Sequence, residues 1–270
     1  MNHQILKILY RSASPGCFIF LEINNYIYIF NPRYANNYFP IGILQSKNPL
    51  SIPRAPFSGY RQHSRLGSLA EIEYASDVLK ADGVGLLTSY GDHWLGDPMF
   101  RPVFEELNRR KAVVFVHPTV PVCCRTLLAD VPPVIEEIPQ DTARAITNLL
   151  YTGTLARFRE IRFIFCHGGG TLPMVYGRML QNPPKNLAER APNGIDYELR
   201  KLYYDVAATA VRPAMAALTS LVPTSQILLG TDNPYVPAEI SMDKNPPIIL
   251  FHIRRVHIQD IPRREERQNN

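Results

Sequence analysis

The sequence predicts an α/β protein with a parallel (β/α)8 barrel fold, and the ends of three strands are the main observations behind this prediction. Three apolar runs have the pattern of buried strands. At the C-terminal end of each lies a side chain that can bind a metal: His117, His167 or Asp232. Catalytic groups of a (β/α)8 barrel lie at the carboxyl ends of its strands. Histidine and aspartate suit a divalent metal that activates water or a substrate oxygen.

Strands and helices alternate through the middle of the chain, which predicts βαβ units and a parallel sheet. The expected strands cover residues 84–88, 112–116, 162–165, 202–206 and 227–229. These five strands fall short of the eight of a full barrel. The residues before them offer only two strand-like runs, with Asn24 and Asn25 between them as a hairpin turn. We therefore expect a barrel that is incomplete at its N-terminal strands and, after Pro237, at its C-terminal helices.

Capping signals predict the helices. Asp97 and Pro98 supply an N-cap and a proline at the first helical position, ahead of an apolar helix face. A long proline-rich loop is expected over 118–139, and Asp141 is expected to cap the helix that follows it. A further helix is expected over 213–221.

The organisation expected for the 270 residues has three parts. Residues 1–65 form an irregular, atypical N-terminal segment, 66–240 the barrel core, and 241–270 a polar C-terminal tail. The apolar fraction of 46% allows a sizeable core for a single large domain.

Charge and cysteine content exclude several classes of protein. The formal net charge of +5 comes largely from the two ends of the chain, so we expect no nucleic-acid partner. No apolar run is long enough to cross a membrane, so we expect no membrane partner. The four cysteines have neither paired metal-ligand spacing nor the density of a secreted disulfide scaffold, which favours a cytoplasmic location.

Several motifs occur in a fixed order between about Leu69 and Pro237. They include Pro102-Val103-Phe104-Glu105-Glu106-Leu107, Phe115-Val116-His117-Pro118-Thr119, Cys166-His167-Gly168-Gly169-Gly170-Thr171-Leu172-Pro173 and Gly230-Thr231-Asp232-Asn233-Pro234. Their order and spacing resemble the decarboxylase branch of the amidohydrolase superfamily, the aminocarboxymuconate-semialdehyde decarboxylase family. Within that branch they are similar to fungal decarboxylases of 6-methylsalicylate. The resemblance implies a TIM barrel of the metal-dependent hydrolase type.

The resemblance also implies roles for the three strand-end residues. His117 matches a metal-binding histidine, His167 a catalytic histidine beside the substrate, and Asp232 an aspartate that touches the metal and moves protons. The implied cofactor is a divalent metal, zinc or manganese. In one respect the chain departs from the family, which opens with a His-x-His pair that this sequence lacks; His3 and His63 stand alone.

The residues alone leave other interpretations open. His117 could merely end a strand, His167 could be a turn residue ahead of three glycines, and Asp232 could serve an Asx turn. Tyr90 and Trp94 follow a strand end and are candidate substrate-binding residues, because an aromatic acid stacks well on their rings. Ordinary loop packing explains both of them equally well.

The function expected from these observations is metal-dependent, non-oxidative decarboxylation of a hydroxylated aromatic acid. An example is conversion of 6-methylsalicylate to m-cresol and CO2 in fungal polyketide secondary metabolism, as in patulin-like pathways. The expected partner is a small aromatic carboxylic acid, and a homo-oligomer is left open. The alternatives are a lactonase-like hydrolase of the same superfamily, or a truncated, inactive homologue, because the His-x-His pair is absent.

Overall fold

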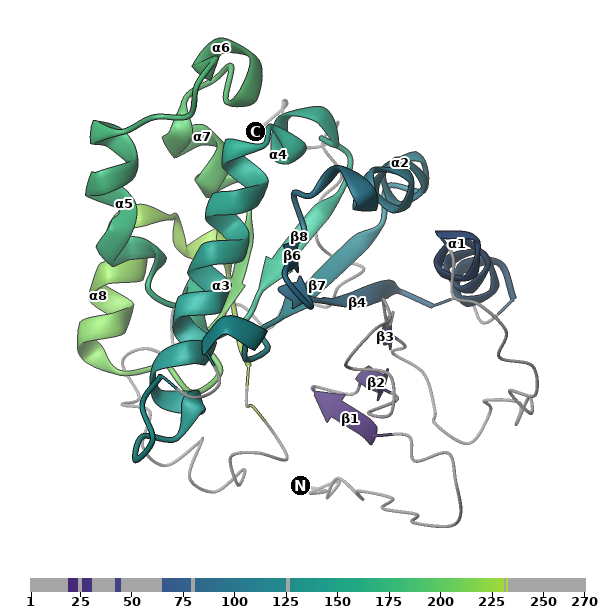
Figure 1. The fold of residues 1–270 in the computed structure, drawn as a ribbon, viewed down its shortest axis with the longest axis horizontal. Coiled ribbons are helices and arrows are strands. Elements are labelled where there is room, and N and C mark those ends of the chain that lie inside the picture. The colour runs from purple at the N-terminus through teal and green to yellow at the C-terminus, as the bar shows by residue number, and fades with distance from the viewer. Residues whose placement is uncertain are drawn as a thin grey trace.

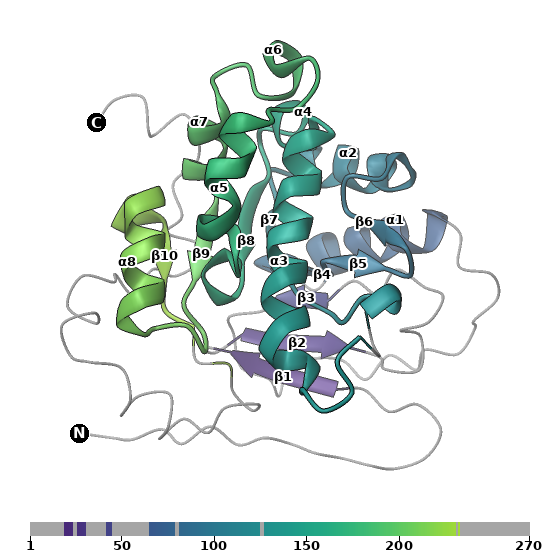
Figure 2. The ribbon, with the colours of Figure 1, turned by 60° about the vertical axis from the view of Figure 1, so that its left-hand side comes forward.

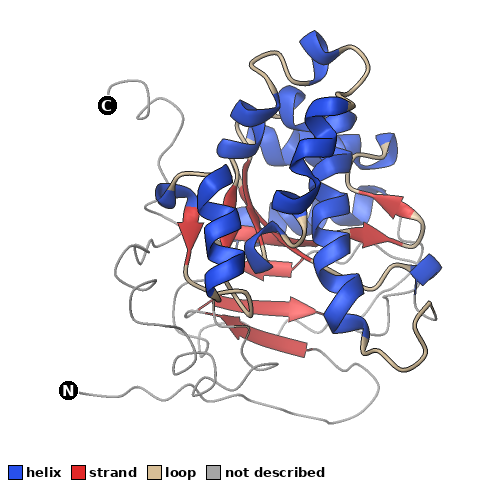
Figure 3. Ribbon diagram, turned by 90° about the vertical axis from the view of Figure 1, so that its left-hand side faces the viewer, coloured by secondary structure: helices blue, strands red, loops and turns tan. Residues whose placement is uncertain are grey.

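A curved, mainly parallel sheet with helices along one side forms the centre of the molecule (Figure 1). The computed structural model describes residues 19–23, 26–30, 42–44, 65–78, 81–124, 127–230 and 232. The strand order in the main sheet is β10-β9-β8-β7-β4-β3. Figure 2 shows helices α3, α5 and α8 in front of the strands, and Figure 3 separates the helices and strands by colour.

Five parallel strands confirm the predicted βαβ pattern. Their bounds are β4 Gly83–Leu87, β7 Val113–His117, β8 Arg162–Phe165, β9 Tyr203–Asp205 and β10 Ile227–Leu228. Each lies within two residues of its expected position at either end. Neighbouring strands pair in parallel, for example Val116 of β7 with Phe165 of β8. Among the described strands the sheet ends at β10 and β3, so they form part of a barrel wall rather than a closed ring.

Helices follow the strands and cover the same side of the sheet. Their bounds are α1 Arg65–Glu73, α2 Arg101–Arg109, α3 Pro133–Tyr151, α4 Thr154–Arg157, α5 Leu172–Gln181, α6 Leu187–Arg190, α7 Ile195–Arg200 and α8 Arg212–Leu221. Asp97 caps a 3-10 turn directly before α2, as predicted, and its side chain accepts a hydrogen bond of 2.8 Å from the Met99 N–H. The expected helix over 213–221 is confirmed by α8.

The prediction for Asp141 was wrong. Helix α3 begins at Pro133, so Asp141 lies inside the helix, and the preceding loop is shorter than expected. The start of this helix was predicted too late because of two prolines. Pro133 lies in the first turn, where proline is tolerated, whereas Pro139 lies inside the helix, where a proline usually ends or kinks a helix. The side chain of Asp141 is fully buried and takes part in a polar network instead of a cap.

Three short strands lie in the N-terminal segment that was expected to be irregular. Strands β1 Ile19–Ile23 and β2 Tyr26–Phe30 form the expected antiparallel hairpin, with Ile23 opposite Tyr26. Strand β3 Gly42–Leu44 pairs antiparallel with β4 and was not predicted, because three residues are too few to show an alternating pattern. The expected tail over 241–270 lies outside the described residues, and the three-part division of the chain stays a prediction.

The core lies between the sheet and its helices. Val103, Phe104 and Leu107 of α2 are buried, as the apolar face of that helix predicted. Phe104 stacks on Phe158 with ring centroids 5.8 Å apart. Burying one such aromatic or leucine side chain contributes about 2–3 kcal/mol to folding. This packing fixes the strand ends that carry the candidate site.

Candidate active site

The candidate site lies where β7 and β8 end side by side. His117 is the last residue of β7, and His167 follows β8 after Cys166. Because parallel neighbours end at the same edge of a sheet, the two histidines face the same region. Their ring centroids are 5.6 Å apart and the ring planes meet at 73°. The structure thus brings His117 and His167 together, and their metal-binding and catalytic roles stay predictions.

The ring of His117 has a defined orientation. Its Nδ1 lies 2.8 Å from the carbonyl oxygen of Pro118, and a carbonyl can only accept, so Nδ1 carries the proton. The Nε2 lone pair of the neutral ring then stays free. Burial, and secondly the neighbouring charge of His167, lower the pKa of His117 to about 4. The ring is thus neutral at physiological pH, which is the form that binds metals.

His167 is held in the same manner. Its Nδ1 lies 2.9 Å from the carbonyl oxygen of Ala207, which leaves its Nε2 free as well. The backbone at His167 has a φ of 55° and continues into three glycines that all have positive φ. At Gly170 a Cβ would collide with the carbonyl of Pro139 in α3. The glycines are therefore required for the close approach of this loop to its neighbours.

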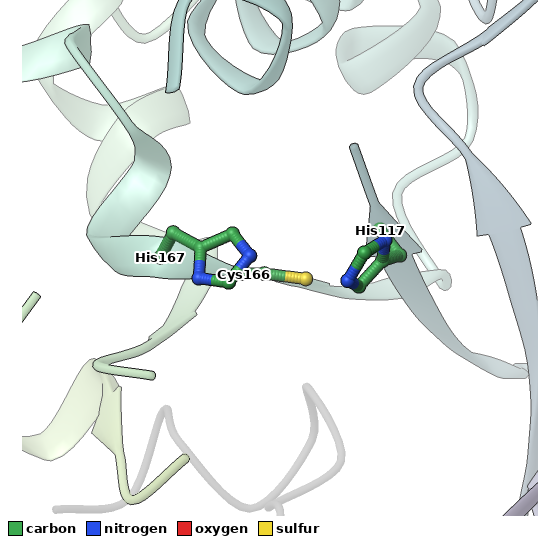
Figure 4. Close-up of side chains that lie close together, drawn as sticks. All are labelled: His117, Cys166 and His167. Carbon is green, nitrogen blue, oxygen red and sulfur yellow. The ribbon is translucent and has the colours of Figure 1, made fainter. Parts of the chain in front are cut away.

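Cys166 completes a cluster of possible ligand atoms (Figure 4). The Cys166 sulfur and one ring nitrogen from each of His117 and His167 all lie within 4.8 Å of one another. The thiol donates to the carbonyl of Val116 over 3.1 Å, and burial raises its pKa well above the ordinary value. Sequence reasoning missed Cys166, and its position directly before His167 was the only available signal.

Two carboxylates lie in the electrostatic surroundings of His167. Asp205 ends β9, is buried, and accepts hydrogen bonds from the backbone N–H of His167 at 3.1 Å and of Ala207 at 2.9 Å. Asp232, the predicted catalytic aspartate, is half-buried. Burial raises the pKa of both carboxyls, while the charge of His167 lowers both. Sequence reasoning missed Asp205, although it lies one residue before the end of the strand predicted over 202–206.

Tyr90 and Trp94, the candidate substrate-binding residues, lie in the hairpin formed by β5 Ser89–Tyr90 and β6 His93–Trp94. Each side chain has a hydrogen-bond partner outside the hairpin. The Tyr90 hydroxyl accepts a hydrogen bond of 2.8 Å from the Leu87 N–H. The indole N–H of Trp94 donates to Asp141 over 2.8 Å. The substrate-binding role of both residues stays a prediction.

The histidine pair matches what a divalent metal requires. In metal sites each ligating imidazole donates its other ring N–H to a carbonyl or carboxylate, which fixes the ring and its tautomer. Both His117 and His167 already do so in this structure. The fold is that of an α/β protein of TIM-barrel type, and the site brings together side chains that could hold a metal ion.

Comparison with known proteins identifies the family. Residues 55–252 match the amidohydrolase family, and the chain belongs to that family. The chain is 37% identical over 179 residues to the 6-methylsalicylic acid decarboxylase of Aspergillus aculeatus, covering 64% of this chain and 54% of that protein. It is also 37% identical over 174 residues to the 6-methylsalicylic acid decarboxylase of Penicillium expansum, covering 63% and 53% respectively. The expected resemblance to this decarboxylase branch is confirmed.

Solved structures support the fold. The 5-carboxyvanillate decarboxylase of Novosphingobium aromaticivorans, complexed with manganese and 4-hydroxy-3-methoxy-5-nitrobenzoic acid, superposes with a TM-score of 0.59 at 16% identity. That match covers 70% of this chain and 58% of the other. The chain spans about half the length of the curated relatives it matches. In the part that the structure describes, no helix is both long and apolar enough to cross a membrane.

Proposed function

We propose that the chain catalyses metal-dependent, non-oxidative decarboxylation of a hydroxylated aromatic acid, with 6-methylsalicylate as the leading substrate. The observation that carries this proposal is the pair His117 and His167, each with Nδ1 tied to a backbone carbonyl and Nε2 free. The named activity of the two fungal relatives supports the choice of substrate class. In the overall reaction the carboxylate leaves as CO2, and one proton replaces it on the ring carbon.

The metal would be held by His117 and Asp232, with His167 at the same cluster. A divalent ion there, zinc or manganese, would act as a template and Lewis acid for the carboxylate and the ortho-phenol oxygen. Manganese is present in one structural neighbour, whereas imidazole and thiol groups suit zinc. The neutral state of His117, with its pKa near 4, keeps a lone pair ready for the ion across the physiological range.

In this proposal Asp232 donates the proton to the ring carbon. A group that protonates the ring carbon must itself be protonated at the right moment, which requires a pKa raised toward the working pH. Burial raises the pKa of Asp232 in this direction. His167, fixed by Ala207 and Asp205, would orient the substrate and stabilise negative charge on its oxygens. Tyr90 and Trp94 remain candidates for stacking against the aromatic ring.

The setting of the proposed enzyme is cytoplasmic fungal polyketide metabolism. Cysteine chemistry supports the location, because Cys123, Cys124 and Cys166 are all free thiols, as in a reducing compartment. The two 6-methylsalicylic acid decarboxylases among the relatives are fungal, which supports the metabolic setting.

The test is product analysis with carboxyl-labelled 6-methylsalicylate and added zinc or manganese. We expect labelled CO2 and 3-methylphenol in equal amounts, and loss of both after addition of a chelator. The variant Asp232→Asn should lose turnover in kcat rather than only in KM, because an amide cannot donate the proton. Asp130→Asn, an exposed aspartate in another loop, is the matched control and should keep its activity.

Two other outcomes would reject the proposal. Ring opening of a lactone substrate without CO2 release would assign the lactonase-like hydrolase reaction instead. A folded chain that binds no divalent metal and leaves all hydroxybenzoates intact would identify an inactive homologue. The metal content of the purified protein, measured before any assay, separates the second outcome from the first.

A further inference from the structure

Asp141 is a fully buried carboxylate that the proposed reaction does not use. It lies in α3 and accepts hydrogen bonds from side chains of two other segments. Oδ1 accepts from the Trp94 indole and from Arg144, both at 2.8 Å. Oδ2 accepts a short hydrogen bond from the Thr88 hydroxyl and a longer one of 3.3 Å from Ser89. The carboxylate therefore accepts hydrogen bonds through both of its oxygens.

Thr88 connects this carboxylate to the loop that follows His117. Because the Thr88 hydroxyl gives its only hydrogen to Asp141, its oxygen is free to accept, and it accepts from the Thr119 N–H over 3.1 Å. The Thr88 backbone N–H also donates to the His117 carbonyl over 3.0 Å. Thr88 therefore fixes the backbone on both sides of Pro118.

The peptide between Pro118 and Thr119 transmits this constraint to the His117 ring. Its N–H is the group held by Thr88, and its C=O is the group that accepts from His117 Nδ1 at 2.8 Å. A peptide unit is planar, so fixing the N–H also fixes the direction of the C=O. Successive hydrogen bonds of this kind polarise one another, which strengthens the acceptor at the end of the chain.

The same turn of α3 also holds the loop that follows His167. The Pro139 carbonyl accepts from the Thr171 N–H over 3.2 Å, and the Gln140 side chain accepts from the Thr171 hydroxyl over 2.9 Å. Pro139 and Gln140 thus hold the loop that follows His167 directly, and Asp141 in the same turn reaches the loop that follows His117 through Thr88. This placement distinguishes Asp141 from a buried acid that only joins two elements of the core.

We propose that Asp141 is a positioning residue that sets the tautomer and ring direction of His117 through Thr88 and the Pro118–Thr119 peptide. Its catalytic consequence rests on the proposed function, but the arrangement itself does not. The hydrogen bond to Asp141 fixes the direction of the Thr88 hydroxyl, so that its oxygen faces the Thr119 N–H and the Pro118 carbonyl stays aimed at Nδ1. The Nε2 lone pair of His117 then stays directed to the cluster with Cys166 and His167.

The test measures the His117 ring directly, by nitrogen NMR of the full chain. The signals are assigned by their loss in His117→Asn. We expect a single tautomer with Nδ1 protonated in the unmodified chain, and a mixture of tautomers in both Asp141→Asn and Thr88→Val. Affinity for cobalt(II), used as the probe ion, should fall about tenfold to a hundredfold in both variants. Thr147→Val is the matched control, because its hydroxyl bonds only to Ala143 within α3, and it should change neither measurement.

A folded Asp141→Asn or Thr88→Val variant with the original tautomer and cobalt affinity would overturn the proposal. If Asp141→Asn does not fold, Thr88→Val decides the question alone, since it removes one hydroxyl and retains the buried carboxylate. If the tautomer shifts as expected but no hydroxybenzoate is decarboxylated by the unmodified chain, the proposed function fails while the positioning role of Asp141 stands.

Discussion

His117 and His167 lie edge to face at the ends of neighbouring parallel strands, with ring centroids 5.6 Å apart. Neither ring is free to rotate, because each donates Nδ1–H to a backbone carbonyl. A site whose ligands are already oriented loses little freedom when an ion binds, and preorganisation of this kind raises affinity. A metal ion could therefore bind here without rearrangement of either ring.

The first prediction concerns metal binding by this pair. His117→Asn and His167→Asn should each weaken zinc binding at least tenfold, measured by calorimetry, because the proposed ion lies at the cluster that both rings face and each variant removes one imidazole from it. His93→Asn is the matched control: His93 is exposed, pairs with Asp97, and should leave the affinity unchanged. Equal affinity in all three variants would place the metal elsewhere.

The second prediction concerns Gly170. Gly170→Ala should lower the free energy of unfolding by about 3 kcal/mol, since the residue has positive φ and its new Cβ would meet the Pro139 carbonyl. Gly177→Ala is the control, because Gly177 lies in α5 with open space around it and should stabilise the protein by about 0.5–1 kcal/mol. Urea unfolding measures both, and similar values for the two variants would contradict the loop geometry.

The strands were predictable from the sequence because their signal is local. Runs such as residues 113–116 are apolar throughout, and buried parallel strands typically have that composition. Strand ends carry polar side chains, so His117, His167 and Asp232 stood out for the same reason. Short elements such as β3 and α6 contain too few residues for any periodic pattern.

Other parts of the site depend on contacts between distant residues, which no local pattern reports. Asp141 lies in α3 and Thr88 at the end of β4, and only folding brings them together. Cys166 has no metal-ligand spacing in the sequence. In the structure the turn at His167, which has a φ of 55°, places the Cys166 sulfur near the rings of His117 and His167. Asp205 differs from these residues, because it lies at the end of β9. The search for polar side chains at strand ends that identified His117 would have identified Asp205 as well.

The third prediction concerns the pH dependence of stability. Hydrogen bonds from Arg109, and then Arg110, lower the pKa of Glu106 from its ordinary value near 4.5 to about 2. A depressed carboxyl pKa contributes stability above the unfolded value, and that stability is lost as pH falls from about 4.5 to about 2. Glu106→Gln should therefore cost about 1 kcal/mol at pH 7, the upper range for a partly exposed ion pair, and progressively less below pH 4.5.

The control for Glu106 is Glu105→Gln. Glu105 pairs with Arg101 at 3.0 Å, but both side chains are more than half exposed, so its loss should be near the limit of detection at every pH. Urea unfolding at a series of pH values measures both variants. A pH-independent cost for Glu106→Gln would show that the effect comes from packing rather than from ionisation.

The last prediction concerns thiol reactivity, in a Cys17→Ser background. Alkylation of the native protein at pH 8 should be fastest at exposed Cys123, slower at Cys124 and absent at buried Cys166. The hydrogen bond to Cys123, 2.7 Å between the sulfurs, raises the pKa of the Cys124 thiol to about 11 and lowers its thiolate fraction. Cys123→Ala removes that bond, so Cys124 should then react faster, as peptide mass mapping would show. Modification of Cys166 in the native protein at the rate of Cys123 would contradict its burial beside both histidines.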